Sequence, residues 1–184
     1  MRSLPPIIPL FPLPNVVLFP QMPLPLHVFE PRYRKMVEDT LAGHRTIGMT
    51  LLRPGWEPDY HGRPPVYPTG CAGVIEQSEP LADGRFNLLV RGTTRFRIVT
   101  EHEGEPYRLA AIGRAIDGPA SLVLQEELPH DLFVNALCQS LTLAPVERQS
   151  LLDCDTVQGR YARLVEILDF LFLEQRYGKG RNPH

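Results

Sequence analysis

Short apolar bursts separated by prolines dominate the first third of the chain. Nine of the 20 prolines lie between Pro5 and Tyr33. Because proline fixes φ and has no backbone donor, neither a long helix nor a central strand is expected there. The pattern instead predicts short extended segments at residues 7–10, 16–19 and 24–29.

A helix and a long loop are predicted next. Pro31 suits the first position of a helix. The residues after it form one apolar stripe at helical spacing, made of Tyr33, Met36, Val37 and Leu41. After a predicted buried strand at residues 46–52, the segment 53–70 carries five prolines and no periodicity, so we predict a loop longer than most connections.

Several short antiparallel strands are predicted between residues 71 and 116. Asp83-Gly84 separates the apolar segments 71–77 and 86–91, which is a good hairpin signal. A second turn is predicted at residues 92–94, before strands at 96–100 and 107–116. Five or more short strands with prolines at the edges favour a small barrel, closed or nearly closed.

The periodicity becomes helical from about residue 125. One predicted stripe contains Phe133, Ala136, Leu137 and Leu141, and a short helix is predicted from Pro145 to Leu152. The clearest amphipathic stripe consists of Leu164, Ile167, Leu168, Leu171 and Phe172. We therefore predict an α+β chain with a barrel domain at residues 1–120, a helical bundle at 121–177 and a disordered tail at 178–184.

The N-terminal motif resembles a known family. PLFPLPNVVLFP (Pro9–Pro20) and PLHVFEPRY (Pro25–Tyr33) are similar to the opening of the Lon protease N-terminal, or substrate-binding, domain. The resemblance implies a barrel related to PUA domains, with one inserted helix, followed by helices. It also implies structural roles for the motif residues Pro12, Phe19, Pro20, Phe29, Glu30, Arg32 and Tyr33.

Composition and charge narrow the possible partners and the compartment. The formal net charge of −2 gives no electrostatic reason to expect nucleic acid or an anionic membrane. No segment has the roughly 20 mostly apolar residues of a membrane span. Three scattered cysteines make a disulfide framework unexpected and suggest a reducing compartment. We expect a folded, cytoplasmic protein.

Motifs for catalysis, cofactors and metals are not found in the sequence. No GxxxxGK[ST] phosphate loop and no GxSxG elbow occur. A serine-lysine dyad is disfavoured because the only lysines are Lys35, on the solvent face of its helix, and Lys179, in the tail. The histidines form no HExxH, and His61 with Cys71 and Asp59 matches no zinc module. We expect no enzyme activity, no cofactor and no metal.

The long loop is the preferred candidate for binding. Trp56 is the only tryptophan and shares the loop with Tyr60 and Tyr67. Exposed aromatic side chains on a proline-stiffened loop offer contact area with little entropy to lose. Together with Phe19 and Met22 of the proline-rich segment, and with strand addition at a sheet edge, they would bind unfolded or extended polypeptide. The alternative is that Trp56 folds back and caps the barrel.

The first functional hypothesis is therefore a stand-alone, non-catalytic protein that binds unfolded polypeptide, as an adaptor or decoy in protein quality control. The second is a PUA-like RNA-binding module that uses Arg91, Arg95 and Arg97, which by default form a solvated strand face. The third is a small-ligand pocket at the barrel mouth. Fold analogy alone supports the last two.

Overall fold

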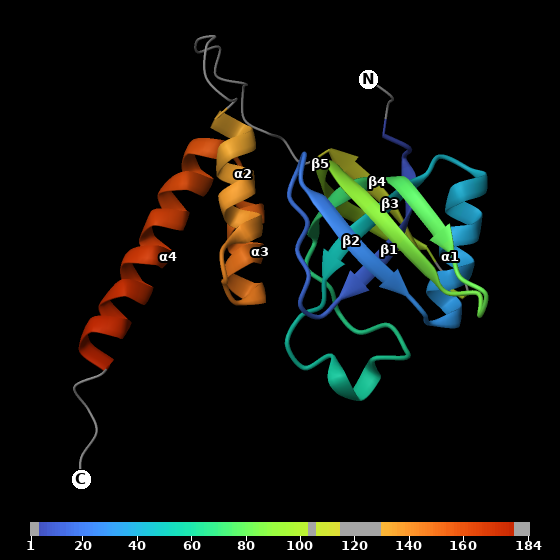
Figure 1. Ribbon diagram of the computed structural model, residues 1–184, viewed down its shortest axis with the longest axis horizontal. Helices are drawn as coiled ribbons and strands as arrows, with labels where there is room; N and C mark the ends of the chain where they lie inside the picture. The colour runs from blue at the N-terminus through green and yellow to red at the C-terminus, as the bar shows by residue number, and fades with distance from the viewer. Residues whose placement is uncertain (1–3, 103–105, 115–129, 179–184) are drawn as a thin grey trace.

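The computed structural model describes residues 4–102, 106–114 and 130–178. A barrel of strands lies beside a layer of helices, and the last helix is farthest from the barrel (Figure 1). The elements are β1 (Ile7–Leu13), β2 (Pro23–Val28), α1 (Pro31–Ala42), β3 (Thr46–Leu51), the 3₁₀ turn η1 (Glu57–Asp59), β4 (Thr69–Pro80), β5 (Phe86–His102), β6 (Arg108–Arg114), α2 (His130–Ser140), α3 (Pro145–Asp153) and α4 (Val157–Gly178). The predicted α+β class with a helical C-terminal part is confirmed.

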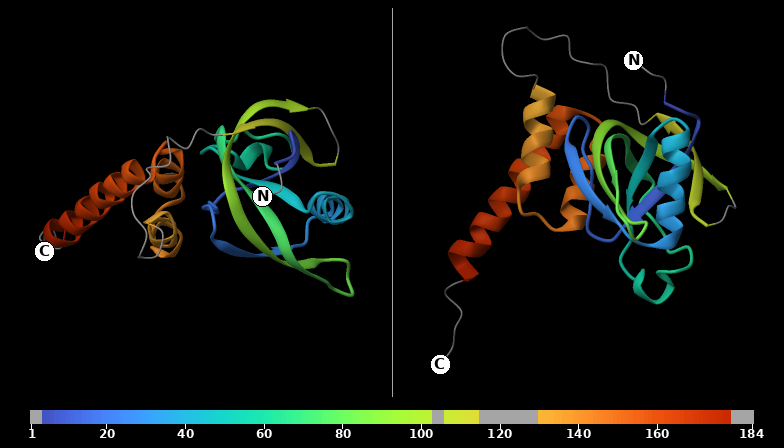
Figure 2. Two further views of the ribbon diagram at one scale, coloured as in Figure 1. Left: turned by 90° about the horizontal axis from the view of Figure 1, so that it is seen from above. Right: turned by 45° about the vertical axis from the view of Figure 1, so that its right-hand side comes forward.

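The sheet closes on itself. Its strand order is β2-β5-β4-β3-β1-β6, and an additional pairing of β5 with β6 closes the ring β5-β4-β3-β1-β6. The β1–β3 pair is parallel, whereas the other pairs are antiparallel. Figure 2 shows the resulting barrel from above, with α1 beside it. β2 pairs only with β5, so it is an added edge strand outside the closed ring.

The prolines of β1 do not keep it out of the middle of the sheet, contrary to the prediction from the sequence. β1 lies between β3 and β6. Residues 7–10 pair with β6 and residues 10–13 pair with β3, so only Leu10 has a partner on both sides. Pro9 and Pro12 thus each lie where the strand has one paired side. The predicted extended segment at 16–19 forms no strand, although Val17, Leu18 and Phe19 are buried.

The turn predicted at residues 92–94 is also wrong, because β5 runs through it without a break. A Cβ atom on Gly92 would lie 2.1 Å from the carbonyl oxygen of Phe19. The glycine therefore permits close contact between two backbones rather than a turn. The hairpin at Asp83-Gly84 is confirmed: Gly84 has φ of +78°, and β4 and β5 pair on either side of it.

Helix α1 presents the predicted stripe to the barrel. Tyr33, Met36 and Val37 are buried, together with Thr40, and Leu41 is half-buried. Pro31 is its first residue, as predicted.

The helical part departs from the predicted stripes. In α2 the buried face consists of Val134, Asn135 and Cys138, whereas Phe133 is 53% exposed. Three residues of the predicted stripe do pack against the core, half-buried: Ala136, Leu137 and Leu141. Only Phe133 was placed wrongly, and the polar Asn135 was missed on the buried face. α3 ends one residue after the predicted Leu152.

One apolar core extends from the barrel into the helices. It includes Val90 of β5, Met36 of α1, Cys138 of α2, Leu151 of α3 and Leu164 of α4. The predicted boundary at residue 120 lies in the range 115–129, outside the described residues. Of the predicted tail, only Gly178 is described, as the last residue of α4.

Buried polar side chains connect the barrel to the helices. Arg95 is 1% exposed, and it donates to the carbonyls of Leu152 at 2.8 Å and Asp155 at 3.2 Å. The Gln149 amide donates to the carbonyl of Thr69 at 3.0 Å. These hydrogen bonds fix α3 on the barrel.

Candidate functional site

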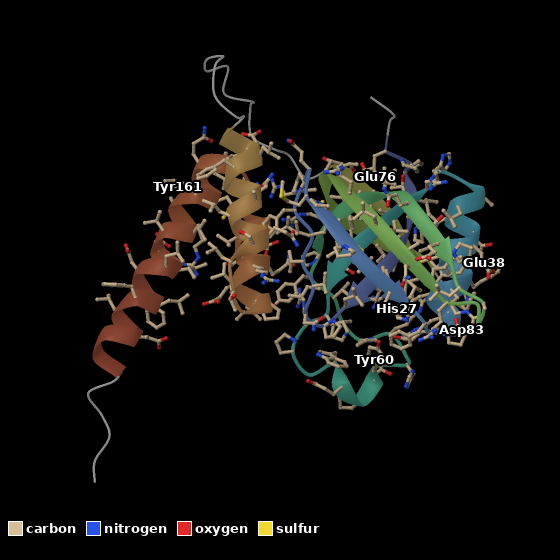
Figure 3. All side chains as sticks on the ribbon, viewed as in Figure 1. His27, Glu38, Tyr60, Glu76, Asp83 and Tyr161 are labelled. Carbon is tan, nitrogen blue, oxygen red and sulfur yellow. The ribbon has the colours of Figure 1, made fainter. Side chains whose placement is uncertain are left out.

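The segment between β3 and β4 crosses one end of the barrel, beside the first turn of α1. It carries η1 and is closed at its base by a bridge between Leu52 and Val66. Figure 3 shows Tyr60 on this segment, below the barrel in that view. We call residues 53–68 the Trp56 loop.

Trp56 and Tyr60 form an aromatic pair on this loop. Their ring centroids are 5.2 Å apart in an edge-to-face arrangement. Both side chains are half-buried, so each keeps part of its surface open to solvent. The structure thus brings together two of the predicted binding residues, as a supported but partly exposed aromatic surface.

Glu30 and Arg32 of the N-terminal motif hold the loop in place. The Tyr60 hydroxyl donates to Glu30 Oε1, and Arg32 Nε donates to Glu30 Oε2 at 3.0 Å. Arg32 Nη2 also donates to the carbonyl of Tyr60 at 3.0 Å, and Arg32 Nη1 donates to the carbonyl of His61 at 3.4 Å. Burial and the hydrogen bond to Glu30 raise the pKa of Tyr60. The loop is therefore anchored at its tip, not only at its base.

A cavity of about 180 Å³ opens under the loop. Three arginines and three tyrosines contribute to its lining: Arg32, Tyr33, Tyr60, Arg63, Tyr107 and Arg108. Small-molecule sites usually enclose about 300–1,000 Å³. The cavity is therefore too small for a whole drug-sized ligand, and its size suits a single side chain.

The arginines around the cavity are held by hydrogen bonds, and Arg108 also forms an ion pair with Glu101. Arg108 Nε donates to Glu101 Oε2 at 2.8 Å, and a second nitrogen contacts the other carboxylate oxygen. Arg108 Nη1 donates to the carbonyl of Pro64 at 2.7 Å. Arg63 Nη2 donates to the carbonyl of His102 at 3.1 Å. These hydrogen bonds give the cavity rigid polar walls.

Tyr33 forms part of the wall next to the core. Its side chain is 4% exposed and packs on Phe11, with ring centroids 4.5 Å apart. Burial is the main cause that raises its pKa to about 12, and Arg32, 4.6 Å from the ring centroid, opposes the shift. Tyr33 therefore stays neutral at physiological pH.

The other predicted polypeptide-binding residues are elsewhere. Tyr67 packs against the core, with the Arg53 guanidinium 5.5 Å from its ring centroid. Phe19 is fully buried and Met22 is 6% exposed, so neither lines an exposed apolar surface as expected. The reason is that residues 16–22 lie between the barrel and the helices, where the Phe19 amide donates to Gln139 Oε1 at 3.2 Å.

The predicted arginine cluster is dispersed. Arg95 is buried, contrary to the predicted solvated face, because α3 lies against this part of β5 and accepts its hydrogen bond. Arg91 pairs with Glu76 at 2.6 Å, and Arg97 is exposed. The three side chains do not form one basic surface for an anion.

The remaining motif residues differ in exposure. Pro12 and Tyr33 line the cavity, and Pro20 accepts a hydrogen bond from the Asn135 amide at 3.2 Å. Phe29 is 59% exposed and stacks on His27, with ring centroids 6.3 Å apart. Sequence reasoning missed three lining residues: Arg63, Tyr107 and Arg108. Arg63 lies in the loop itself, where only the aromatic residues were singled out. Tyr107 and Arg108 lie at the start of β6, far along the chain from the loop, and no local pattern connects them with it.

Among residues 4–102, 106–114 and 130–178, no group of three or more His, Cys, Asp or Glu side chains is placed to hold a metal ion. In the same part of the chain, no helix is long and apolar enough to cross a membrane.

Comparison with known proteins decides the family. Residues 7–128 match the model of the ATP-dependent protease La (LON) substrate-binding domain. The chain belongs to this family. The match covers the barrel with its Trp56 loop, and it includes the motif on which the resemblance was based.

Curated relatives of this Lon-domain chain are much longer than it is. Lon protease from Dictyoglomus thermophilum is 33% identical over 114 residues, which cover 60% of this chain and 14% of that protein. Lon protease 2 from Desulfotalea psychrophila is 27% identical over 193 residues, covering 88% of this chain and 25% of that protein. The chain therefore spans a quarter or less of the length of these relatives.

Solved structures agree with the described fold. A Lon N-terminal domain protein from Xanthomonas campestris superimposes with a TM-score of 0.66 at 27% identity, covering 87% of this chain and 97% of that one. The N-terminal domain of a Mycobacterium avium complex Lon protease gives 0.60 at 15% identity and supports the fold alone.

Proposed function

We propose that this Lon-domain chain binds extended segments of unfolded polypeptide without catalysing a reaction. The observation that carries the proposal is the half-exposed Trp56–Tyr60 pair, held beside a cavity that suits one side chain. Membership of the substrate-binding family supports a substrate-binding role. The segment bound would lay an apolar or aromatic side chain across the pair, with a neighbouring side chain in the cavity.

Because the Trp56 loop is anchored, polypeptide binding at this site costs little conformational entropy. Binding by a mobile loop costs conformational entropy, and a loop held in its bound shape avoids most of that cost. Here Glu30 and Arg32 fix Tyr60 from the side of α1. Burying one large apolar side chain contributes about 1.5–3 kcal/mol, so one such contact gives weak, reversible binding. Several contacts along one polypeptide would be needed for micromolar affinity.

Strand addition at a sheet edge is not retained in the proposal. β2 is the added edge strand, and its first three residues are Pro23, Leu24 and Pro25. Each proline lacks the N–H that a new strand would need, and prolines protect sheet edges from pairing. Binding is therefore assigned to side chains of the loop.

Absence of catalysis is part of the proposal. The matched family model is a substrate-binding domain. Lys35, one of only two lysines, is exposed and paired with Asp39 at 2.6 Å. Its pKa is raised, chiefly by the hydrogen bond to Asp39, which is opposite to what a lysine base requires. The chain would act as an adaptor in protein quality control if a partner protein unfolded and cleaved the bound polypeptide.

The test is a titration of a labelled, permanently unfolded polypeptide with this protein, followed by fluorescence anisotropy at low and moderate salt. We expect saturable binding that changes little with salt, because the contacts are apolar. Trp56→Ala should weaken binding about tenfold, which corresponds to about 1.4 kcal/mol. The control is Phe133→Ala, which removes a more exposed aromatic side chain from α2, away from the loop.

Three results would contradict the proposal. No binding at high micromolar protein would remove the function. Equal binding by wild type and Trp56→Ala would remove the site. Affinity that falls steeply with salt would point to RNA-like polyanion binding instead.

A further inference from the structure

The hydroxyl group of Tyr33 has no hydrogen-bond partner among the residues that the structure describes. Tyr33 lines the cavity under the Trp56 loop, and its side chain is 4% exposed. The other two tyrosines of the lining are bonded, because Tyr60 donates to Glu30 and Tyr107 donates to Asp39 Oδ2 at 2.9 Å. Buried polar groups are normally hydrogen-bonded. The partner of the Tyr33 hydroxyl therefore comes from outside the described chain.

This hydroxyl group borders the cavity. In the described part of the chain, the side-chain atoms that are both enclosed by protein and without a hydrogen bond do not include the Tyr33 oxygen. The oxygen is therefore in contact with open space, and Tyr33 lines the cavity. Its ring packs on Phe11 of the core, with ring centroids 4.5 Å apart. A group that enters the cavity can therefore bond the hydroxyl.

Arg32 and Arg108 supply further donors beside Tyr33. The Arg32 guanidinium lies 4.6 Å from the centroid of the Tyr33 ring, and Arg108 lines the cavity with 8% of its surface exposed. Burial raises the pKa of Tyr33, Arg32 and Arg108 lower it, and Glu30 raises it, so both arginines act on the hydroxyl. A guanidinium has five N–H groups, and the described residues accept three hydrogen bonds from each arginine. Each arginine can therefore donate further hydrogen bonds to a ligand.

Acceptors are scarce on the cavity wall. The described lining residues include no aspartate and no glutamate. Glu30 and Glu101, which pair with the arginines, are not among these lining residues. Three carbonyl groups of the loop already accept arginine N–H groups, those of Tyr60, His61 and Pro64. A ligand in the cavity therefore meets mainly hydrogen-bond donors.

We propose that the cavity binds one carboxylate of the polypeptide, with the Tyr33 hydroxyl, Arg32 and Arg108 as donors. This inference rests on the proposed function and names the class of segment that is bound. A carboxylate only accepts hydrogen bonds, and its two oxygens match the planar guanidinium group. A glutamine amide also carries an NH₂ donor, for which the wall has few acceptors. The volume of about 180 Å³ suits one side chain.

Two parts of a polypeptide present this group, an acidic side chain and the C-terminal carboxylate. Tyr60 belongs both to the cavity lining and to the aromatic pair with Trp56. The bound segment therefore carries an aromatic or large apolar residue next to its carboxylate. Because Arg32 and Arg108 are already paired with glutamates and the site is partly buried, we expect this contact to depend only weakly on salt.

The test uses three labelled peptides of one sequence that ends in phenylalanine. The first has glutamate before the phenylalanine and an amidated C-terminus. The second has glutamine in place of the glutamate, and the third is the glutamine peptide with a free C-terminal carboxylate. Anisotropy titrations with the full chain give three dissociation constants. We expect the first or the third peptide to bind about tenfold more tightly than the second, because hydrogen bonds to charged groups are the stronger ones. The peptide that does so identifies the source of the carboxylate.

Tyr33→Phe tests the donor. This variant keeps the ring on Phe11 and removes the hydroxyl. We expect its preference for carboxylate over amide to fall from about tenfold to about threefold or less, with unchanged affinity for the glutamine peptide. Tyr107→Phe is the matched control, because Tyr107 lines the same cavity but its hydroxyl is bonded to Asp39. It should keep the preference, and both variants should keep the circular dichroism of the wild type.

Each other outcome has a defined meaning. Equal affinity for the three peptides, weakened by Trp56→Ala, would overturn the carboxylate site and leave the proposed function standing. An unchanged preference in Tyr33→Phe would show that water satisfies the hydroxyl, and it would overturn the proposed site. If the unfolded polypeptide binds and none of the three peptides does, the carboxylate site alone is wrong. If neither the polypeptide nor the peptides bind, both proposals are wrong.

Discussion

Arg95, on strand β5, donates a hydrogen bond of 2.8 Å to the carbonyl of Leu152, near the end of helix α3. Arg160, on α4, donates to the preceding carbonyl, that of Leu151, at 3.0 Å. Both guanidinium groups therefore lie at the C-terminus of α3, where the helix dipole favours positive charge and carbonyls lack partners within the helix. This contact explains how a buried arginine can stabilise the junction between the barrel and the helices.

Replacing Arg95 with methionine should destabilise the protein strongly. Methionine fills much of the same space, but it leaves the buried carbonyl of Leu152 without this donor and removes the partly buried hydrogen bond to the carbonyl of Asp155. An unsatisfied buried polar group costs about 1–3 kcal/mol. We expect Arg95→Met to lower the free energy of unfolding by about 2–4 kcal/mol, as measured by urea denaturation.

The control for this experiment is Arg97→Met. Arg97 lies two residues along the same strand and is exposed. Surface substitutions of this kind usually change stability by less than about 0.5 kcal/mol. Equal effects at the two positions would mean that the contact with α3 contributes nothing measurable.

A single methyl group at Gly92 should also be destabilising. The new Cβ would lie 2.1 Å from the carbonyl oxygen of Phe19, which is a backbone atom and cannot rotate away. Overpacking costs about 1–3 kcal/mol, and we expect Gly92→Ala to reach at least the upper part of this range. Gly113→Ala is the comparison, because its Cβ would meet Val99 Cγ2 at an ordinary 3.4 Å. Thermal unfolding of both variants measures the difference, and similar midpoints would contradict the close contact.

Stability should fall at alkaline pH because of Tyr33. Its folded-state pKa is raised to about 12, chiefly by burial, while the unfolded value is about 10. The folded protein therefore holds a proton that the unfolded chain releases. This stabilisation is complete below about pH 10, and it is lost as the pH rises from about 10 to about 12. Two pKa units correspond to about 2–3 kcal/mol.

Tyr33→Phe isolates this contribution. Phenylalanine keeps the ring on Phe11 and cannot ionise. The variant should lose about 2–3 kcal/mol less than the wild type between pH 10 and pH 12, as measured by urea denaturation at each pH. Parallel pH profiles for the two proteins would show that Tyr33 is accessible enough to ionise in the folded state.

The Tyr60 hydroxyl should hold the tip of the Trp56 loop. Tyr60→Phe keeps the ring beside Trp56 but removes the donor to Glu30. We expect faster hydrogen exchange of the Asp59 and Gly62 amides, which donate to Trp56 and Asp59 carbonyls within the loop. Global stability should fall by about 1 kcal/mol, because the site is partly exposed. Unchanged exchange would show that the loop keeps its shape without this anchor. Tyr67→Phe serves as the control.

Much of the fold could be predicted from local patterns. Proline at the start of α1, its stripe of Tyr33, Met36 and Val37, and the turn at Gly84 each depend on neighbours in sequence. The errors arise from contacts between distant segments. Gly92 was predicted to be a turn residue, but a glycine is needed there because the backbone of Phe19 leaves no room for a Cβ atom. Arg95 looked solvent-facing because α3 could not be placed from the sequence.

The candidate site was predicted only in part, because most of its contacts join segments that are distant in the sequence. Trp56 and Tyr60 are four residues apart, so their contact is local. The anchoring of Tyr60 by Glu30 spans 30 residues, and Arg108 reaches the cavity from β6. Phe19 and Met22 were misplaced because an apolar, proline-rich segment has the same composition whether it is covered by helices or open to solvent.

Trp56 is the only tryptophan in the chain, so its own fluorescence reports directly on the proposed site. The decisive measurement is the emission of Trp56 during titration with an unlabelled, tryptophan-free, permanently unfolded polypeptide. The account predicts a saturable change in emission whose midpoint agrees with the dissociation constant from anisotropy. Saturable anisotropy with no change in Trp56 emission would contradict it, because the polypeptide would then bind away from the Trp56 loop.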